Sequence, residues 1–577
     1  EFAKKHPQIA EKLDIKNGES TDPHTERIIE SVAFMAAKLN KKIDGTEQSI
    51  AFYLLSALYP SLISQFPPCS IASFLNSGRV NVSNTIHISK GTNLFVDSKS
   101  RYSCLFKTLY DIDLYPIAIN SVNLEKSTRE ADGWRIKINI NTLSVPIENL
   151  QIKDILFYIN SEILENSLII YESIFSNKKP AFIKINEKLV QIEPEEFAPC
   201  GFSDHESICP VSKYSNNVFQ LFQEMLHFKQ KFMFFKLKNI AKYVSCSLEK
   251  NIDKFEIIID INLRNERLRN VNLNNALMIN AVPIVNLFPV TSDPFRFTGT
   301  KSKYLLVPDQ SKEKAIEIHS ILDIHMIDSE TKEDRIIQPY FPLAIDSDTN
   351  IVHDTYWTYS REPSNIRGLK GYDTYISFVD QNMNPFSSYS DVVYATTLCT
   401  NRFETREIPV FSKLEVDGIE SGGYEAKVIL KPTEPVSFIE KTSVLWGLIS
   451  NLSATHISIA NEINLFSSIT KLIEIFSSGN KLKSEELLSS ITRIKIDKIV
   501  RRFGKDAWRG FVKGIEFRAF IKDEYNSFFS FFFCCILNQY LSMRVNINSF
   551  IELKLFSEKT NELLAKWNPT SGRMDLL

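Results

Sequence analysis

Between Asp22 and Pro60, apolar residues recur every three or four positions, and this helical spacing predicts two helices joined as a hairpin. Asp22 can cap free amide groups, and Pro23 at the first helical position loses no hydrogen bond. Gly45 and Thr46 interrupt the pattern, so we expect a second helix to follow them and to end at Pro60. The apolar positions that share one face of the first helix are Ile28, Val32, Met35 and Leu39.

Apolar stripes this broad limit how the two helices can exist. An isolated helix is marginal in water, because most helical stability in proteins comes from burying an apolar face. The two helices must therefore pack on the rest of the chain or on another chain. The inward positions of the second helix are Ile50, Leu54, Ala57 and Leu58.

Strand patterns dominate the middle of the chain. Apolar and polar residues alternate over residues 134–140 and 255–263, which indicates half-buried strands. Residues 156–175 and 219–235 have helical spacing. Residues 329–390 are polar and contain several prolines, so we expect long loops with little regular structure there. Further strands are expected at residues 85–88, 93–96, 104–108, 279–288 (interrupted by Pro283), 304–307, 316–327, 392–399 and 424–430.

The last third of the chain mixes helices with strands. Asp523 and Glu524 stand at the start of an apolar segment, residues 525–541, where negative charge favours a helix. Residues 543–555 alternate as a final strand or bent strand pair. The remaining expected elements are helices at 443–452 and 462–476 and strands at 493–500 and 515–521.

These patterns predict an α+β multidomain protein with N-terminal helices, β-rich middle domains and an α+β C-terminal domain. A chain of 577 residues is too long for one hydrophobic core, so three or four domains are expected. The predicted boundaries are 1–65 for an N-terminal helical segment, 66–240 for a β-rich domain with helices, 241–435 for a second β-rich domain with long loops, and 436–577 for the C-terminal α+β domain.

The composition is that of an ordinary globular protein, with 44% apolar and 24% charged residues. A net charge of −2 gives no bulk field that would draw the chain to nucleic acid or an acidic membrane. Eight cysteines in so long a chain do not make a disulfide framework. Cys534 and Cys535 lie in the most apolar run, residues 528–537, which is far shorter than the roughly 20 residues of a membrane span. We therefore expect a buried helix with buried thiols in a reducing cytoplasm.

The first residues, 1–5, are typical of a helix interior, so we expect a further segment before them.

Cys200, His205 and Cys209 are the one cluster with metal-ligand residue types. A structural zinc site requires four ligands, usually with closer cysteine pairs, so the pattern favours an irregular loop with two buried thiols over zinc. His87, His319 and His325 fall on expected strands and are interpreted as structural. The sequence contains no nucleophile elbow, phosphate-binding loop or dinucleotide fingerprint. We predict a protein that is not an enzyme and holds no cofactor or metal.

Two other functions stay open from the residues alone. The basic stretch from Arg493 to Lys522 contains Trp508 and Phe511 and could bind nucleic acid. Two aromatic residues are too few for a stacking platform, so a solvated strand face or a patch for an acidic partner is favoured. A polysaccharide-acting enzyme would require a pair of carboxylates in one cleft.

Short motifs recur in order over the whole chain and together resemble the TssF family, also called VasA or ImpG, of bacterial type VI secretion systems. Their order and spacing carry the resemblance, since no single tripeptide is diagnostic. The most specific motif is Pro283-x-Val285-Asn286-Leu287-Phe288 with Asp293-Pro294. The others are Glu1-Phe2-Ala3, Pro7-x-Ile9-Ala10, Asp22-Pro23-x-x-Glu26-Arg27, Ala33-Phe34, Leu58-Tyr59-Pro60, Cys104-x-Phe106-Lys107-Thr108-x-x-Asp111, Leu114-Tyr115-Pro116, Gln220-Leu221-Phe222-Gln223-Glu224, Lys231-Phe232, Cys399-Thr400-Asn401-Arg402, Lys431-Pro432-Thr433, Trp446-x-Leu448-Ile449-Ser450, Ile547-Asn548-Ser549-Phe550, Trp567-x-Pro569 and Gly572-Arg573.

The resemblance implies a structural component of the baseplate wedge. It implies that two copies pair with one TssG, that six wedges surround the VgrG spike, and that TssK and TssE join the wedge to the membrane complex and the sheath. It also implies a cytoplasmic location at the inner face of the bacterial inner membrane. In this setting, we interpret five residues of the first helix as an inter-subunit bundle face, the alternative being that they pack within the chain. The five are Ile28, Val32, Phe34, Met35 and Leu39.

Overall fold

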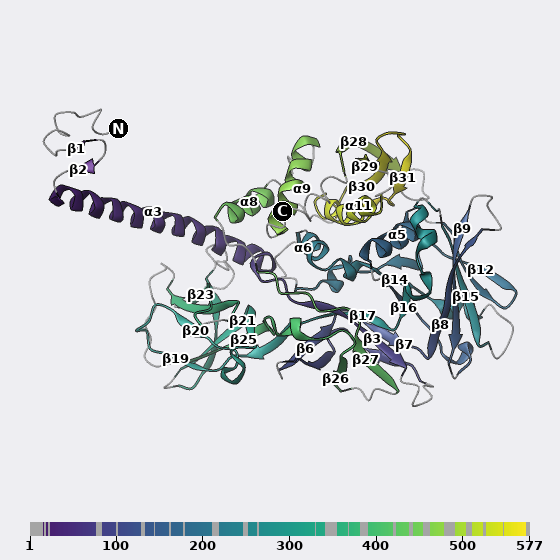
Figure 1. Cartoon of the computed structure of the whole chain (residues 1–577), viewed down its shortest axis with the longest axis horizontal. Helices are drawn as coiled ribbons and strands as arrows, with labels where there is room; N and C mark the ends of the chain where they lie inside the picture. The colour runs from purple at the N-terminus through teal and green to yellow at the C-terminus, as the bar shows by residue number, and fades with distance from the viewer. Residues whose placement is uncertain are drawn as a thin grey trace. The chain divides into compact units, whose positions relative to one another are not determined.

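The structure is a computed structural model, in which the chain divides into two compact units (Figure 1). Unit 1 comprises Glu1–Leu58 with Ile439–Ser453, and unit 2 comprises Tyr59–Phe438 with Ala454–Leu577. The residues that the structure describes are 15–16, 19–20, 23–76, 84–99, 102–127, 133–143, 145–160, 163–176, 179–210, 219–245, 252–261, 263, 265–328, 331–340, 355–366, 369–380, 391–418, 423–437, 442–453, 462–477, 491–502, 511–522, 527–545 and 547–572.

Unit 1 holds one long helix where the sequence predicts a hairpin. Helix α3 runs for 36 residues without a break over Pro23–Leu58, through Gly45 and Thr46. The hairpin prediction is therefore wrong. A glycine inside a helix costs only about 1 kcal/mol relative to alanine, and no proline stands between the two halves. The other elements are α8 (Thr442–Ser453), which contacts α3, and a short antiparallel pair, β1 (Ile15–Lys16) and β2 (Glu19–Ser20).

Unit 2 contains a closed barrel whose strands come from distant parts of the chain (Figure 1). The strand predicted over residues 279–288 divides at Asn280, which has a φ of 57°, and Pro283 lies inside a barrel strand. The interruption predicted at Pro283 is thus wrong, because the proline sits within a paired strand while the left-handed asparagine redirects the chain. The barrel strands, in spatial order, are β17 (Ala281–Val285), β3 (Cys69–Asn76), β27 (Tyr424–Val428), β26 (Lys413–Val416), β5 (Asn93–Asp97) and β6 (Ser103–Thr108).

Two smaller sheets belong to the same unit. The alternation over residues 134–140 is confirmed, since Ile136, Ile138 and Ile140 are buried on one face. The helical prediction for 156–175 holds only for its second half, because a strand precedes the helix α5 (Leu164–Phe175). The five-stranded sheet has the order β12 (Lys188–Ile192), β11 (Ala181–Ile185), β15 (Lys254–Ile261), β9 (Trp134–Thr142), β8 (Ile117–Lys126). The four-stranded sheet has the order β13 (Phe197–Pro199), β14 (Phe234–Leu237), β10 (Ile155–Ile159), β16 (Leu277–Ile279).

The largest sheet has eight strands and includes a region expected to be loops. Residues 329–390 contain three strands, so that prediction is wrong. These strands bury Trp357, Ile376 and Phe378, their tyrosines and serines are half-buried, and their prolines lie at strand ends. The strands are β18 (Phe288–Thr291), β25 (Asp391–Thr400), β21 (Glu317–Ile327), β22 (Asp334–Pro339), β23 (Tyr356–Pro363), β24 (Tyr372–Val379) and β20 (Tyr304–Leu306), with β19 (Phe295–Phe297) paired to β25.

The C-terminal sheet is built around a parallel pair. Strands β29 (Phe511–Ile521) and β30 (Phe550–Ser557) run parallel, and the helix between them, α11 (Ser527–Ser542), is buried along its length. Parallel neighbours require such a crossover. The burial of Cys534 and Cys535 on α11 is confirmed. The other strands are β28 (Arg493–Arg502), β31 (Leu563–Lys566) and β32 (Thr570–Ser571).

The mixed, β-rich α+β class predicted from the sequence is confirmed, while the four domain boundaries stay a prediction. In the part of the chain that the structure describes, no helix is both long and apolar enough to cross a membrane. The remaining helices and strands are α4 (Pro60–Ile63), α6 (Gln220–His227), α7 (Ile240–Ser245), α9 (Glu462–Phe476), β4 (Ile86–Ile88) and β7 (Ile112–Leu114).

Gly514 leaves room for an aromatic ring in the C-terminal sheet. It is paired with Phe550 across the parallel strands, and a β-carbon at position 514 would overlap the Phe550 ring. We expect Gly514→Ala to destabilise the chain by about 1–3 kcal/mol through overpacking, seen as a lower midpoint of thermal unfolding. Adding Phe550→Leu should recover part of the loss, because the shorter side chain frees space. An unchanged midpoint for Gly514→Ala would contradict this account.

Candidate protein interface

The five predicted interface residues lie on α3 and are all exposed. The exposed fractions are 65% for Ile28, 55% for Val32, 70% for Phe34, 57% for Met35 and 60% for Leu39. Four of them form one stripe, because spacings of three and four residues return to the same helix face. Phe34 lies about 100° around the helix from Met35 and therefore points away from the stripe.

This part of α3 has no internal support. Residues 30–40 are exposed at every position, so nothing in the described chain covers any side of the helix there. Farther along α3, Ala51 and Leu55 are fully buried. Among the described residues nothing covers these five side chains, and their role as an interface stays a prediction. An exposed helix with an apolar face gains stability only when something covers that face.

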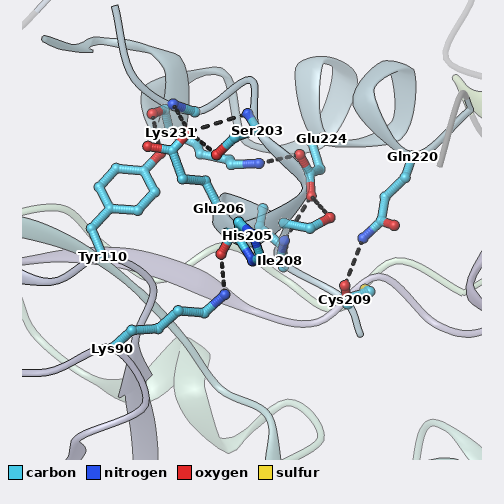
Figure 2. Close-up of polar contacts among 12 residues, drawn as sticks. Lys90, Tyr110, Ser203, His205, Glu206, Ile208, Cys209, Gln220, Glu224 and Lys231 are labelled. Atoms are coloured by element: carbon cyan, nitrogen blue, oxygen red, sulfur yellow. Dashed lines mark hydrogen bonds and ion pairs between the residues drawn. The ribbon is translucent and has the colours of Figure 1, made fainter. Parts of the chain in front are cut away.

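Two family motifs meet in a buried ion pair (Figure 2). Glu224 of α6 pairs with Lys231 of a 3-10 turn, η4 (Lys229–Phe232), and neither side chain is exposed. The other carboxylate oxygen of Glu224 accepts hydrogen bonds from the Ile208 N–H at 2.7 Å and the Ser207 hydroxyl at 3.3 Å. The Lys231 carbonyl accepts from the Tyr110 hydroxyl at 2.9 Å. The pair thus ties α6 and η4 to the irregular segment before them.

That irregular segment is the one that carries Cys200, His205 and Cys209. Both cysteines are buried, as predicted, and burial raises the pKa of the Cys200 thiol to about 12 and that of Cys209 as well. Metals bind the thiolate, which such pKa values disfavour. Glu206 accepts from the Gly201 N–H at 2.8 Å, and the Gln220 amide donates to the Cys209 carbonyl at 3.0 Å (Figure 2). Among the described residues, no three His, Cys, Asp or Glu side chains gather as metal ligands. Hydrogen bonds and the ion pair therefore hold this loop.

A second buried cluster joins the most specific motif to a later one. The Asn286 amide donates to the Leu105 carbonyl and to the Asn401 side chain, both at 2.7 Å, and accepts from the Asn401 N–H at 2.6 Å. Next to it, the Arg402 guanidinium donates to the Ile316 carbonyl at 2.8 Å and lies 3.3 Å from Asp373. These contacts join the barrel to the eight-stranded sheet, so the motif residues are structural.

His319 is a buried histidine on β21, which confirms that it falls on a strand. Burial, together with the positive charge of Arg361, lowers its pKa from 6.5 to about 3. Its Nε2 atom lies 4.0 Å from the Cys209 sulfur, and the Arg361 guanidinium donates to the His319 carbonyl. His319 is therefore neutral in the folded chain near neutral pH. His87 and His325 also lie on strands.

The basic stretch 493–522 is partly neutralised within its own sheet. Three acidic residues, Asp497, Glu516 and Glu552, lie on β28, β29 and β30. Asp497 lies 3.5 Å from Arg518, Glu516 lies 2.6 Å from Arg518 and 2.5 Å from Lys554, and Glu552 lies 2.5 Å from Arg501 and 3.0 Å from Lys566. Trp508 lies outside the described residues. The observed pairing favours a solvated strand face over a nucleic-acid surface.

Buried motif residues together with an unsupported apolar helix are typical of a structural subunit that completes its fold in an assembly. A family model described as "Type VI secretion system, TssF" matches residues 1–574. The type VI secretion system component TssF1 of Pseudomonas aeruginosa is 20% identical, covering 99% of this chain and 96% of that protein. The chain belongs to the TssF family of type VI secretion system baseplate components, a structural family and not an enzyme family.

Solved structures share the fold. One is the type VI secretion system TssK-TssF-TssG baseplate subcomplex determined by cryo-electron microscopy, with a TM-score of 0.75 and 18% identity, covering 96% of this chain and 99% of that chain. Another is the baseplate complex from the type VI secretion system, with a TM-score of 0.54 and 15% identity, covering 99% of this chain and 96% of that chain. The similarity therefore extends over nearly the whole length of both chains.

Removing one partner of the Glu224–Lys231 pair should be costly. Lys231→Met leaves the Glu224 carboxylate buried and unpaired, so we expect a loss of about 3–5 kcal/mol in the free energy of unfolding, measured by urea titration. The double variant Glu224→Gln/Lys231→Met should recover much of it, because no unpaired charge remains. Arg406→Met breaks an exposed pair with Glu434 and serves as the control, with an expected loss below about 1 kcal/mol. Equal losses for Lys231→Met and Arg406→Met would contradict the prediction.

His319 should make stability fall in acid. The folded chain keeps the ring neutral down to a pKa of about 3, whereas the unfolded chain binds a proton below 6.5, so stability is lost as pH falls from 6.5 toward 3. The contribution has a slope of up to about 1.4 kcal/mol per pH unit. His319→Asn has no titrating group at this position and so lacks the pH-dependent contribution. The free energy of unfolding of the wild type minus that of the variant should therefore fall, with up to this slope, when urea titrations are repeated from pH 7 to pH 4. His87→Asn controls for loss of an exposed histidine. A difference that stays constant over this range would be incompatible with a buried neutral His319.

Proposed function

We propose that the chain is a wedge subunit of the type VI secretion baseplate and that the exposed face of α3 joins a helical bundle with TssG. The match of the TssF family model to residues 1–574 is the observation that carries the proposal. A protein of the same fold forms part of a TssK-TssF-TssG baseplate subcomplex, so we expect TssK and TssG to be partners of this chain.

The finer assembly follows the family resemblance. In this proposal two copies of the chain pair with one TssG, six such wedges surround the VgrG spike, and TssE links the wedge to the sheath. The complex lies in the cytoplasm at the inner face of the bacterial inner membrane and reaches the membrane only through the membrane complex. The chain itself supports sheath assembly and contraction by holding neighbours in place.

The exposed stripe of α3 has the chemistry that a bundle needs. Ile28 to Leu39 spans 12 helical residues, a contact about 18 Å long. Full burial of each large apolar side chain stabilises a complex by about 1.5–3 kcal/mol. Phe34, on a different face, could contact a second helix, such as one from the other copy of the chain. One helix packed against the stripe and a second packed against Phe34 would therefore cover both faces at once.

Charged residues on the stripe should prevent assembly without unfolding the chain. Val32→Glu/Met35→Glu places two carboxylates where the bundle would be dry, so we expect TssG to be lost from affinity purification after co-expression. The variant should stay soluble with an unchanged thermal midpoint, because both positions are exposed in the chain alone. Ala37→Glu puts a carboxylate on the opposite face of the helix and serves as the matched control.

Recovery of TssG at the wild-type level with Val32→Glu/Met35→Glu would refute the bundle face. Purification of the wild-type chain from cells, followed by mass spectrometry, tests the wider proposal. TssG and TssK are the expected partners, with TssE and VgrG recovered when whole baseplates are isolated. Recovery of nucleic acid in their place would refute the baseplate assignment.

A further inference from the structure

Unit 2 contains a groove of about 840 Å³ that the motifs and the buried clusters do not explain. It is bordered by β8 and β16, the outermost strands of the five-stranded and four-stranded sheets, and by the barrel strands β3 and β27 (Figure 1). The 3-10 turn η6 (Leu273–Asn275) forms part of its wall. The groove thus lies where the edges of two sheets meet the barrel.

The lining of this groove carries no charge. It contains no Asp, Glu, Lys, Arg or His, although 24% of the chain is charged. A carboxylate pair of the kind a glycosidase requires is therefore missing from this groove. Large apolar side chains lie exposed around it: Leu75 at 41%, Leu143 at 42%, Ile163 at 57% and Phe411 at 69%.

Side-chain amides supply the polar groups of the groove. Asn274 accepts from the Val122 N–H of β8 at 3.3 Å, and Asn272 caps η6. The side-chain amides of Asn160, Asn275 and Asn280 have no hydrogen-bond partner among the described residues. A neutral amide both donates and accepts, which matches the N–H and C=O groups of a peptide backbone.

The backbone of Phe411, the most exposed aromatic residue at the groove, is held in an unusual conformation. Its φ is 67°, a left-handed conformation that is a true outlier for a bulky residue, and its N–H donates to the Val428 carbonyl at the end of β27 at 2.6 Å. Strained residues of this kind persist where the surrounding structure fixes them, and they gather at functional sites. Here the strained residue places its aromatic ring at the groove.

We propose that this groove binds an extended, uncharged segment of a neighbouring protein subunit, with a large apolar side chain against Phe411. The outermost strands β8 and β16 offer backbone groups for an added strand, the free amides bond to its backbone, and the apolar rim takes its side chains. A charged segment would lose its hydration without gaining a partner. The proposal deepens the proposed function and rests on it in naming a subunit of the assembly as the source, but it uses a surface separate from the α3 stripe.

The first test uses the purified full-length chain and short random peptides displayed on phage. Selection should enrich peptides that lack Asp, Glu, Lys and Arg and contain a large apolar residue. Phe411→Asn should weaken the selected peptides about ten-fold or more in fluorescence anisotropy. It should leave the thermal midpoint unchanged or raised, because asparagine tolerates a positive φ. Ile163→Gln, a second rim variant, should weaken binding in the same direction.

Phe511→Asn is the matched control, since Phe511 is 78% exposed and lies on β29 outside the groove lining. Enrichment of charged peptides, no enrichment, or equal affinity for wild type and Phe411→Asn would overturn the proposal. Val32→Glu/Met35→Glu should bind the selected peptides normally while losing TssG. A failure of the groove and a failure of the α3 interface can therefore be told apart.

The second test identifies the occupant in the assembled baseplate. A photocrosslinking phenylalanine analogue at position 411 should join this chain to a neighbouring subunit within an uncharged stretch, located by mass spectrometry of the crosslinked peptide. The same analogue at position 511 controls for contact by chance. Crosslinks confined to this chain itself, or to a charged stretch of a partner, would refute the proposal.

Discussion

The Glu224–Lys231 pair is buried on both sides, so it is stable only if every group around it is satisfied. This constraint organises its surroundings: the Ile208 and Ser207 donors must reach the carboxylate, which fixes the irregular segment that follows β13. The Tyr110 hydroxyl then binds the Lys231 carbonyl and attaches the segment after β6 to the same point. These contacts thereby fix a loop that has few regular backbone hydrogen bonds.

The Asn286–Asn401 contacts act in the same way between the barrel and the eight-stranded sheet. They connect the end of β17 to the end of β25, two strands that belong to different sheets. Because both amides are buried, replacing either would leave a polar group without a partner. The family motifs therefore mark the places where separate sheets are joined, and their polar residues serve the fold.

The two exposed surfaces, the α3 stripe and the groove, differ from these buried polar clusters. The α3 stripe is apolar, and residues 30–40 of that helix are exposed at every position in the described part of the chain. The groove beside β8 and β16 is lined by amides and apolar side chains without charge. Neither carries groups for catalysis. Both gain free energy when a protein segment covers them, since apolar area is removed from water and backbone groups find partners. A baseplate subunit needs surfaces of this type.

The sequence by itself determined much of the local structure. Period-two alternation located β9 and β15, the helix expected at 462–476 has the bounds of α9, and the strand expected at 493–500 is part of β28. The apolar run around Cys534 is the buried α11. It also identified the α3 stripe, because an apolar face can be read from spacing alone. The family followed from the order of the motifs along the chain.

Only the tertiary structure decided which elements meet. Alternation reports that one face of a strand is buried but does not name the neighbouring strand, so the barrel of strands from residues 69 to 428 could not be foreseen. Gly45 and Pro283 looked like breaks because local preference is weak beside the hydrogen bonds of a long helix or a closed barrel. The sequences of β23 and β24 are polar enough to suggest loops. They are strands because neighbouring strands of the sheet bond to them and one of their faces is buried in the folded chain. The groove and the left-handed Phe411 depend on contacts between distant segments, which no local pattern records.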